Sequence, residues 1–224
     1  MTFDSHEWVL RREMIRVAHR LAAQGFFPGT SGNLSARLST GRVLITPSGI
    51  PKSRLQPEEL LIVHLDGEVE QGMRGLRPTT ETPMHLEVYR QRPEVAAVVH
   101  AHPAAAVALT LAEVSLEEPT LPEVLLLLGP VPTTAYATPS SEENRLAIAD
   151  LIRDHDVLLL ARHGSLTVGR SLDEAAQRLE VLEHAAHTLL WAHMLGAVAP
   201  LPAEALSKLA AVRQAYLDQA PPKA

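Results

Sequence analysis

The chain contains no cysteine among its 224 residues. Disulfide scaffolds, thiolate zinc sites and thiol catalysis are therefore excluded, and any metal must rest on nitrogen and oxygen donors, for which 11 histidines are available. The 20 lysines and arginines do not exceed the 26 acidic residues, and the net charge of -6 argues against a nucleic-acid partner. All apolar stretches fall well short of the roughly 18 residues that a membrane span requires, so no membrane partner is expected.

The remaining composition is that of an ordinary globular protein, with 46% hydrophobic and 21% charged residues. Acidic and basic side chains precede any apolar run at the start, which predicts no signal peptide and a cytoplasmic location. No repeat, low-complexity tract or linker divides residues 1–224. We therefore expect a single domain, with the proline-containing tail after about residue 197 peripheral to it.

Hydrophobic spacing predicts helices and strands that alternate along the chain. Apolar residues three and four apart predict helices over residues 8–24, 80–91, 104–111 and 173–195. Short apolar or alternating runs between turn residues predict strands over residues 34–38, 43–45, 60–65, 96–102, 158–163 and 167–169. This order favours an α/β fold in which helices flank a mainly antiparallel sheet.

Two histidines, His100 and His102, stand two residues apart on a predicted strand, so their side chains leave the same face and can reach one ion. His163 is the candidate third ligand because it ends a separate apolar strand and precedes Gly164, where a backbone or substrate can approach closely. Three imidazoles on Zn2+ leave a fourth position for a carboxylate, water or substrate oxygens. Paired histidines on a strand can also be ordinary core or surface residues, so the second strand ending in His-Gly is the feature that favours a metal.

The other histidines lack this pattern. Three that fall on the long predicted helix are interpreted as solvated or interface residues: His184, His187 and His193. Four have no partner at ligand spacing and are assigned no role: His19, His64, His85 and His155.

Two turns rich in small polar residues, Gly29 to Asn33 and Thr46 to Gly49, can offer backbone N–H groups and hydroxyls to a phosphate without a large basic charge. Thr79 and Thr80, at the start of a predicted helix, form a third cluster of donors. Glu81 follows them in the first helical turn. Its carboxylate either complements the helix dipole or lies beside a metal and a bound phosphate, where it can shuttle a proton.

Five motifs follow one another along nearly the whole chain: Gly29-Thr30-Ser31-Gly32-Asn33-Leu34-Ser35, Ile45-Thr46-Pro47-Ser48-Gly49-Ile50-Pro51, Thr79-Thr80-Glu81, Val99-His100-Ala101-His102 and His163-Gly164. In this order and spacing they resemble the class II aldolase and adducin head domain family, typified by L-fuculose-1-phosphate aldolase. The resemblance implies a single α/β/α domain around a central, mainly antiparallel sheet. It also implies a homotetramer with active sites between neighbouring subunits.

Carried over to the matching positions, the resemblance implies that one Zn2+ per chain is held by His100, His102 and His163, with Glu81 as fourth ligand or base. It places the phosphate of the substrate on Gly32, Asn33, Ser48, Gly49, Thr79 and Thr80.

One departure from the family concerns the proton donor. The aldolase has a tyrosine, contributed by a neighbouring subunit, in the segment that aligns with residues 121–126, where this chain has Leu126. Glu123, three residues earlier, resembles the acidic residue that the methylthioribulose-1-phosphate dehydratase branch uses there. The family's second tyrosine, on the C-terminal tail, corresponds to Tyr216 in this alignment.

The expected function is a zinc-dependent class II aldolase that cleaves a small phosphorylated ketose, a ketose 1-phosphate, to dihydroxyacetone phosphate and an aldehyde. A metal that coordinates the C2 carbonyl and the adjacent hydroxyl acidifies neighbouring protons, so an enediolate can form as the C3–C4 bond breaks. By resemblance Glu81 favours an aldolase over a 4-epimerase, which carries aspartate there, and Glu123 keeps a dehydratase open. A decarboxylase of a 3-oxo-acid phosphate is a further branch. A non-enzymatic adducin-like interaction module would be expected to lose the metal ligands, which this chain retains.

Overall fold

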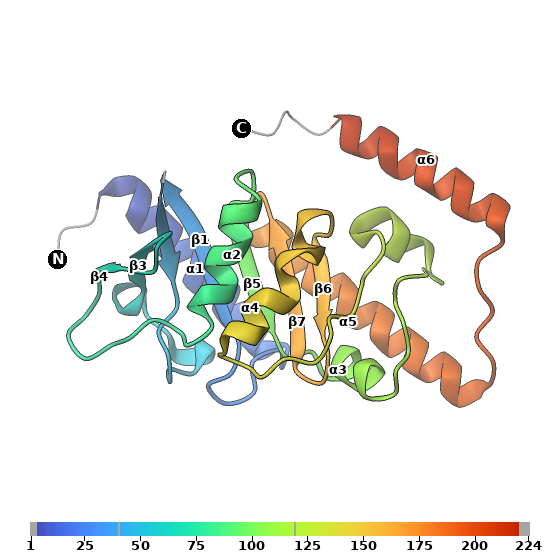
Figure 1. Cartoon of the computed structure of the whole chain (residues 1–224), viewed down its shortest axis with the longest axis horizontal. Helices are drawn as coiled ribbons and strands as arrows, with labels where there is room; N and C mark the ends of the chain where they lie inside the picture. Colours follow the sequence, from blue (N-terminus) through green and yellow to red (C-terminus); the bar gives the residue numbers. More distant parts are fainter. Residues whose placement is uncertain (1–3, 40, 119, 220–224) are drawn as a thin grey trace.

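The computed structural model of the chain describes residues 4–39, 41–118 and 120–219. A seven-stranded sheet forms its centre, with the strand order β4-β3-β2-β1-β5-β7-β6 and antiparallel pairing between all neighbours (Figure 1). The strands are β1 (Asn33–Ser39), β2 (Arg42–Ile45), β3 (Leu61–His64), β4 (Val69–Gln71), β5 (Ala97–Ala101), β6 (Val157–Leu160) and β7 (Gly164–Gly169).

Helices cover both faces of this sheet (Figure 1). One face packs against α1 (Ser5–Ala23) and α5 (Leu172–Leu195), and the other against α2 (Thr82–Gln91) and α4 (Glu142–Ala149). A third apolar cluster joins α3 (Ala104–Leu111) to α5 and to the helical turn Val124–Leu128. The last helix, α6 (Ala203–Gln219), stands apart from the sheet and contacts the same turn. The predicted fold class, an α/β domain with helices on both sides of a mainly antiparallel sheet, is confirmed.

The alternation of side chains along β1 and β5 separates the apolar core from the polar site. Leu34 and Val99 point toward α1 and α5, whereas Val98 packs on the side of α2. His100 shares the parity of Val98, and Asn33 is its direct partner in the β1–β5 ladder. The alternation of side chains therefore places Asn33 and His100 on the face of the sheet that packs against α2.

Two predicted strand boundaries were wrong by three residues. The strand predicted over residues 167–169 begins at Gly164. The strand predicted over residues 158–163 ends at Leu160, and residues 161–163 form a tight turn in which His163 N–H donates to Leu160 O. Leu160 pairs with Gly164 across the β6–β7 hairpin, so only three residues are left to reverse the chain, and Arg162 takes a φ of 60°. His163 consequently lies in a turn and not at the end of a strand.

Three elements were not predicted: β4, α4 and α6. Their exposed positions, such as Val69, Leu146 and Val212, weaken the hydrophobic periodicity by which such elements are recognised. Within the part of the chain that the structure describes, no helix is both long and apolar enough to cross a bilayer.

Candidate metal centre

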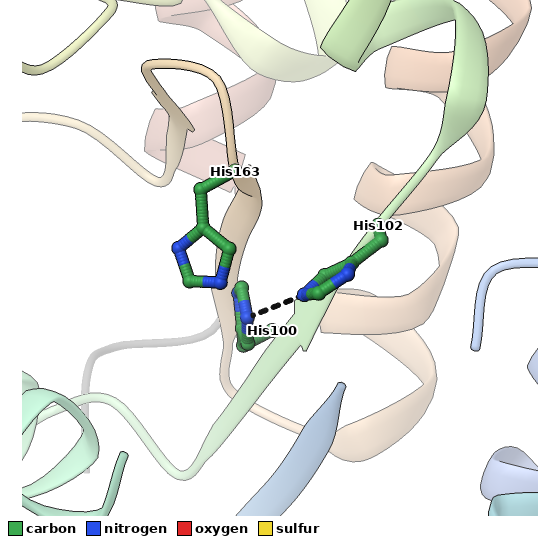
Figure 2. Close-up of side chains that lie close together, drawn as sticks. All are labelled: His100, His102 and His163. Atoms are coloured by element: carbon green, nitrogen blue, oxygen red, sulfur yellow. Dashed lines mark hydrogen bonds between the residues drawn. The ribbon is translucent and has the colours of Figure 1, made fainter. Parts of the chain in front are cut away.

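Three histidine side chains converge from two separate parts of the chain (Figure 2). His100 lies in β5, His102 directly follows this strand, and His163 lies in the β6–β7 turn. Their ring centroids are 4.7 to 5.0 Å apart, and one nitrogen of each ring lies within 4.8 Å of the other two. The Nε2 atoms of His100 and His102 are 3.1 Å apart, so both rings point to the same side, as predicted.

Glu81 brings a carboxylate to this cluster from the residue immediately before α2. Its Oε2 lies 3.1 Å from His100 Nε2, and its Oε1 lies 3.5 Å from His163 Nε2. Three imidazoles and one carboxylate form a donor set that suits a divalent ion such as Zn2+.

The orientation of the His100 ring tests whether these residues fit a cation. His100 Nδ1 lies 2.9 Å from the main-chain oxygen of Ser165. A carbonyl can only accept, so Nδ1 carries a proton and Nε2 is the ring atom directed at the Glu81 carboxylate. A nitrogen and a carboxylate oxygen 3.1 Å apart are held together either by a proton on the nitrogen or by a cation beside both atoms. With that proton replaced, the residues present offer the nitrogen and oxygen donors that fit a divalent ion.

Burial sets the charge of the remaining groups. It lowers the pKa values of His102 and His163 to about 4, an effect that positive charge at His100 increases, so both rings are neutral near pH 7. Burial alone raises the pKa of Glu81, but the charge of His100 and the hydrogen bonds from His100 and Asn33 outweigh it and hold that pKa below its ordinary value. His102 and His163 thus offer neutral nitrogens and Glu81 offers an anionic carboxylate, the forms in which these groups bind metals.

A chain of buried hydrogen bonds holds Glu81 from behind. Asn33 Nδ2 donates to Glu81 Oε2 at 2.8 Å, which leaves Asn33 Oδ1 to accept from His85 Nε2 at 2.5 Å. His85 Nδ1 then accepts from Ser35 Oγ at 2.7 Å, and Ser35 Oγ accepts from the Tyr89 hydroxyl at 2.8 Å. Burial and the charge of His100 lower the pKa of His85 to about 3, so its ring is neutral and has the one donor and one acceptor that this direction requires.

This chain of hydrogen bonds changes the interpretation of two residues. The side chain of Asn33, predicted to bind phosphate, is buried and already engaged with Glu81 and His85. His85 received no role from the sequence, yet it determines which way the Asn33 amide faces. Helical spacing is the sequence feature that could have identified this role of His85. Glu81, His85 and Tyr89 follow one another at intervals of four residues and so share one face of α2.

The three polar turns meet beside the histidine cluster. Thr46 joins the first two, since its N–H donates to Leu34 O and its Oγ1 accepts from Leu34 N–H at 3.2 Å. Thr79 N–H donates to Thr46 O at 3.1 Å and attaches the third turn. Of the six residues predicted to hold the phosphate, Ser48, Gly49 and Thr80 are exposed, whereas Gly32, Asn33 and Thr79 are buried.

Two glycines allow the main chain to approach the histidines closely. Gly32 has a φ of 66°, and a Cβ on it would lie 3.0 Å from the main-chain oxygen of His100. A Cβ on Gly164 would lie 2.3 Å from Ala101 O and 3.0 to 3.1 Å from ring atoms of His102 and His100. The spacing of β5 and β7 around the cluster therefore depends on glycine at position 164.

The structure does not bring Glu123 to this cluster. Glu123 is exposed at the start of the turn Val124–Leu128, and it has no hydrogen bond or ion pair to the cluster within the described residues. Tyr216 lies in α6, and its side chain falls outside the described side chains. Arg213 of α6 donates to the carbonyls of Leu125 and Leu126 at 3.0 Å, so both candidate proton donors belong to one substructure at the edge of the domain.

The family model for the class II aldolase and adducin N-terminal domain matches residues 12–190. The chain belongs to this family. The predicted resemblance is thereby confirmed, and class II aldolases typically depend on a divalent metal, for which the cluster of His100, His102 and His163 is suited.

Relatives within the class II aldolase family catalyse different reactions. The chain is 37% identical over 188 residues to the 3-oxo-tetronate 4-phosphate decarboxylase of Escherichia coli (strain K12), over 82% of this chain and 87% of that protein. It is 30% identical over 211 residues to the 5-deoxy-D-ribulose 1-phosphate aldolase of Bacillus thuringiensis serovar kurstaki, over 93% and 97% of the two chains. The solved structure of an L-fuculose 1-phosphate aldolase matches with a TM-score of 0.85 at 26% identity, over 95% of this chain and 98% of that one.

Replacing Gly164 by alanine should damage both the fold and the metal centre. The new Cβ would meet Ala101 O, a main-chain atom of β5, so the pairing of β5 and β7 could persist only after a shift of the backbone. We expect the free energy of unfolding to fall by about 1 to 3 kcal/mol and bound metal to be lost. Thermal unfolding and elemental analysis of the purified protein measure the two effects.

Ser165→Ala is the matched control on the neighbouring residue of β7. The Ser165 hydroxyl is buried and has no hydrogen-bond partner among the described residues, so its removal should leave the free energy of unfolding within about 1 kcal/mol of the parent or raise it. Metal content should be unchanged. Equal stability and equal metal content in the two variants would contradict the requirement for glycine at position 164.

Proposed function

We propose that the chain is a metal-dependent carbon–carbon lyase that decarboxylates a small 3-oxo acid phosphate. The observation that supports this most strongly is the meeting of His100, His102, His163 and Glu81 in one cluster beside a junction of polar turns. In this proposal the three histidines hold one Zn2+ per chain, and Glu81 is the fourth ligand or the base.

When bound, a divalent ion at these residues supplies a Lewis acid that polarises a ketone and stabilises negative charge on oxygen. A 3-oxo-tetronate 4-phosphate carries its carboxylate on C1, a hydroxyl on C2 and the ketone at C3. When CO2 departs, the electron pair of the C1–C2 bond remains as an enediolate across C2 and C3. Protonation of C2 then yields dihydroxyacetone phosphate, so atoms and charges balance without an oxidant.

The segment 121–126 favours decarboxylation over aldol cleavage. As an aldol bond breaks, a proton must leave the hydroxyl of the departing carbon, and the family resemblance assigns this step to a tyrosine. Leu126 occupies that position here and cannot move a proton. CO2 departs without such a step, so the absence of this tyrosine does not prevent decarboxylation. The similarity to a 3-oxo-tetronate 4-phosphate decarboxylase agrees with this choice.

Glu81 is assigned to proton transfer, because an anionic carboxylate at the cluster can carry a proton to or from the substrate carbon. Asn33 keeps this carboxylate in place. The phosphate of the substrate is assigned to the neutral donors at the polar turns, Gly32, Ser48, Gly49, Thr79 and Thr80, whereas the Asn33 side chain is engaged with Glu81 and His85.

Aldol cleavage of a ketose 1-phosphate is the second candidate reaction. The match to the solved L-fuculose 1-phosphate aldolase favours it. It requires Glu123 or Tyr216 of a neighbouring subunit to accept the hydroxyl proton during cleavage, the group that is the proton donor in the reverse reaction, and hence a homotetramer with sites between subunits. Exposed apolar side chains near the end of α5 offer a surface for such assembly: Trp191, Met194 and Leu195.

The products distinguish these reactions. The metal-loaded protein is incubated with a panel of 3-oxo acid phosphates and ketose 1-phosphates while dihydroxyacetone phosphate, CO2 and aldehyde are assayed. Dihydroxyacetone phosphate with CO2 and no aldehyde is expected. An accompanying aldehyde identifies the aldolase, and a diketone phosphate formed without carbon–carbon cleavage identifies a dehydratase. Fully metal-loaded protein that converts none of these compounds contradicts the proposed function.

His163→Ala should lower the metal content from about one ion per chain to nearly none, since loss of one of three imidazoles sharply weakens a zinc site. His184→Ala is the control, because His184 is exposed on α5 and has no place in the cluster. Elemental analysis after dialysis measures both variants. Full metal content in His163→Ala would show that the ion binds elsewhere.

Glu81→Gln keeps the size of the side chain and one acceptor but cannot carry the proton. The turnover rate should fall by about 10²- to 10⁴-fold, the usual contribution of positioned acid–base catalysis, while the three histidines retain the metal. Glu123→Gln should stay within a few-fold of the parent if the reaction is decarboxylation. If Glu81→Gln instead retains a turnover rate within a few-fold of the parent, Glu81 does not transfer a proton and only complements the helix dipole.

A further inference from the structure

Lys52 is a buried cation without an acidic partner. It begins the short helical turn Lys52–Arg54 and is only 2% exposed. Across residues 4–39, 41–118 and 120–219, no carboxylate lies within ion-pair distance of its ammonium group. The other buried lysine or arginine side chain in these ranges, Arg11, has Glu7 at 2.7 Å. A buried ammonium without a counter-charge is costly, so Lys52 needs an explanation that Arg11 does not.

Main-chain oxygens of the polar turns hold this ammonium. Lys52 Nζ donates to Thr30 O at 2.8 Å and to Ile50 O at 3.2 Å. Thr30 belongs to the turn that leads to Asn33, and Ile50 directly follows Gly49 of the second turn. The ammonium therefore ties two of the three polar turns together. The two carbonyls supply partial negative charge but no full counter-charge.

The surroundings of Lys52 set its charge. Burial lowers the pKa of Lys52 to about 8, and the negative charge of Glu81 opposes this effect. Lys52 is thus charged near pH 7 and interacts both with the polar turns and with the Glu81 carboxylate.

We propose that Lys52 supplies the positive charge of the phosphate pocket, and that the phosphate of the substrate is the counter-ion that the chain itself does not provide. This inference rests on the proposed function and deepens it, because it restricts substrates to phosphorylated compounds and excludes their unphosphorylated analogues. The exposed donors Ser48, Gly49 and Thr80 are neutral, so without Lys52 the turns would take up a dianion with no compensating charge. The sequence alone had predicted a pocket of neutral donors only.

Binding of inorganic phosphate to the metal-loaded full chain, measured by titration calorimetry, tests this role without turnover. Lys52→Met removes the charge at similar side-chain length, and the affinity for phosphate should fall at least tenfold. Arg54→Met is the matched control, because Arg54 lies in the same helical turn, carries the same charge and is exposed. Arg54→Met should bind phosphate within about two-fold of the parent. Phosphate should accordingly raise the melting temperature of the parent and of Arg54→Met, and should do so much less for Lys52→Met.

Unchanged phosphate affinity in Lys52→Met would overturn the proposal. Acetate binding is measured in the same way. If Lys52→Met loses acetate binding but keeps phosphate binding, the proposal is overturned too, because Lys52 would then bind a carboxylate and not the phosphate. Lys52→Gln, which keeps a donor for one carbonyl, serves if Lys52→Met fails to fold, and the same tenfold loss is expected. Failure of the proposed function would appear in the product assay and leave the phosphate measurement valid, so the two failures are distinguishable.

Discussion

The contact between the Glu81 carboxylate and His100 Nε2 is the constraint on which the rest of the site depends. Glu81 Oε2 and His100 Nε2 lie 3.1 Å apart, and each group is held from behind, because Asn33 donates to the carboxylate and the Ser165 carbonyl accepts from the ring. The buried hydrogen bonds of His85, Ser35 and Tyr89 fix the Asn33 amide in turn. The fold therefore keeps a nitrogen and a carboxylate oxygen side by side, an arrangement that suits a shared divalent ion.

Two periodicities build this geometry together. Along β1 and β5 the period of two sends Leu34 and Val99 into the core and sends Asn33 and His100 toward α2. Along α2 the spacing of four residues lines up Glu81, His85 and Tyr89 on the side that faces these strands. A polar row on the sheet thus meets a polar row on a helix, and each supplies the hydrogen-bond partners that burial of the other requires.

The candidate metal site and the candidate proton donors lie in different parts of the molecule. The histidines, Glu81 and the polar turns belong to the sheet and to the segments that connect its strands. The segment with Glu123 and Leu126 and the helix α6 form a separate unit, joined through Arg213 at the edge of the domain. In the proposed function the metal site therefore does not depend on this unit, and the relatives of this chain include both a decarboxylase and an aldolase.

Local patterns in the sequence were enough to predict the order of most helices and strands. They also predicted that His100 and His102 point to the same side and that Glu81 lies at the start of a helix. These features depend on neighbours a few residues away. The turn position of His163, the orientation of Asn33 and the burial of Lys52 depend on partners that are distant along the chain. Asn33 and Glu81 are 48 residues apart, and His100 and Ser165 are 65 apart. Spacing shows which face a side chain leaves, but only tertiary packing determines what that face meets and whether a charge is shielded from water.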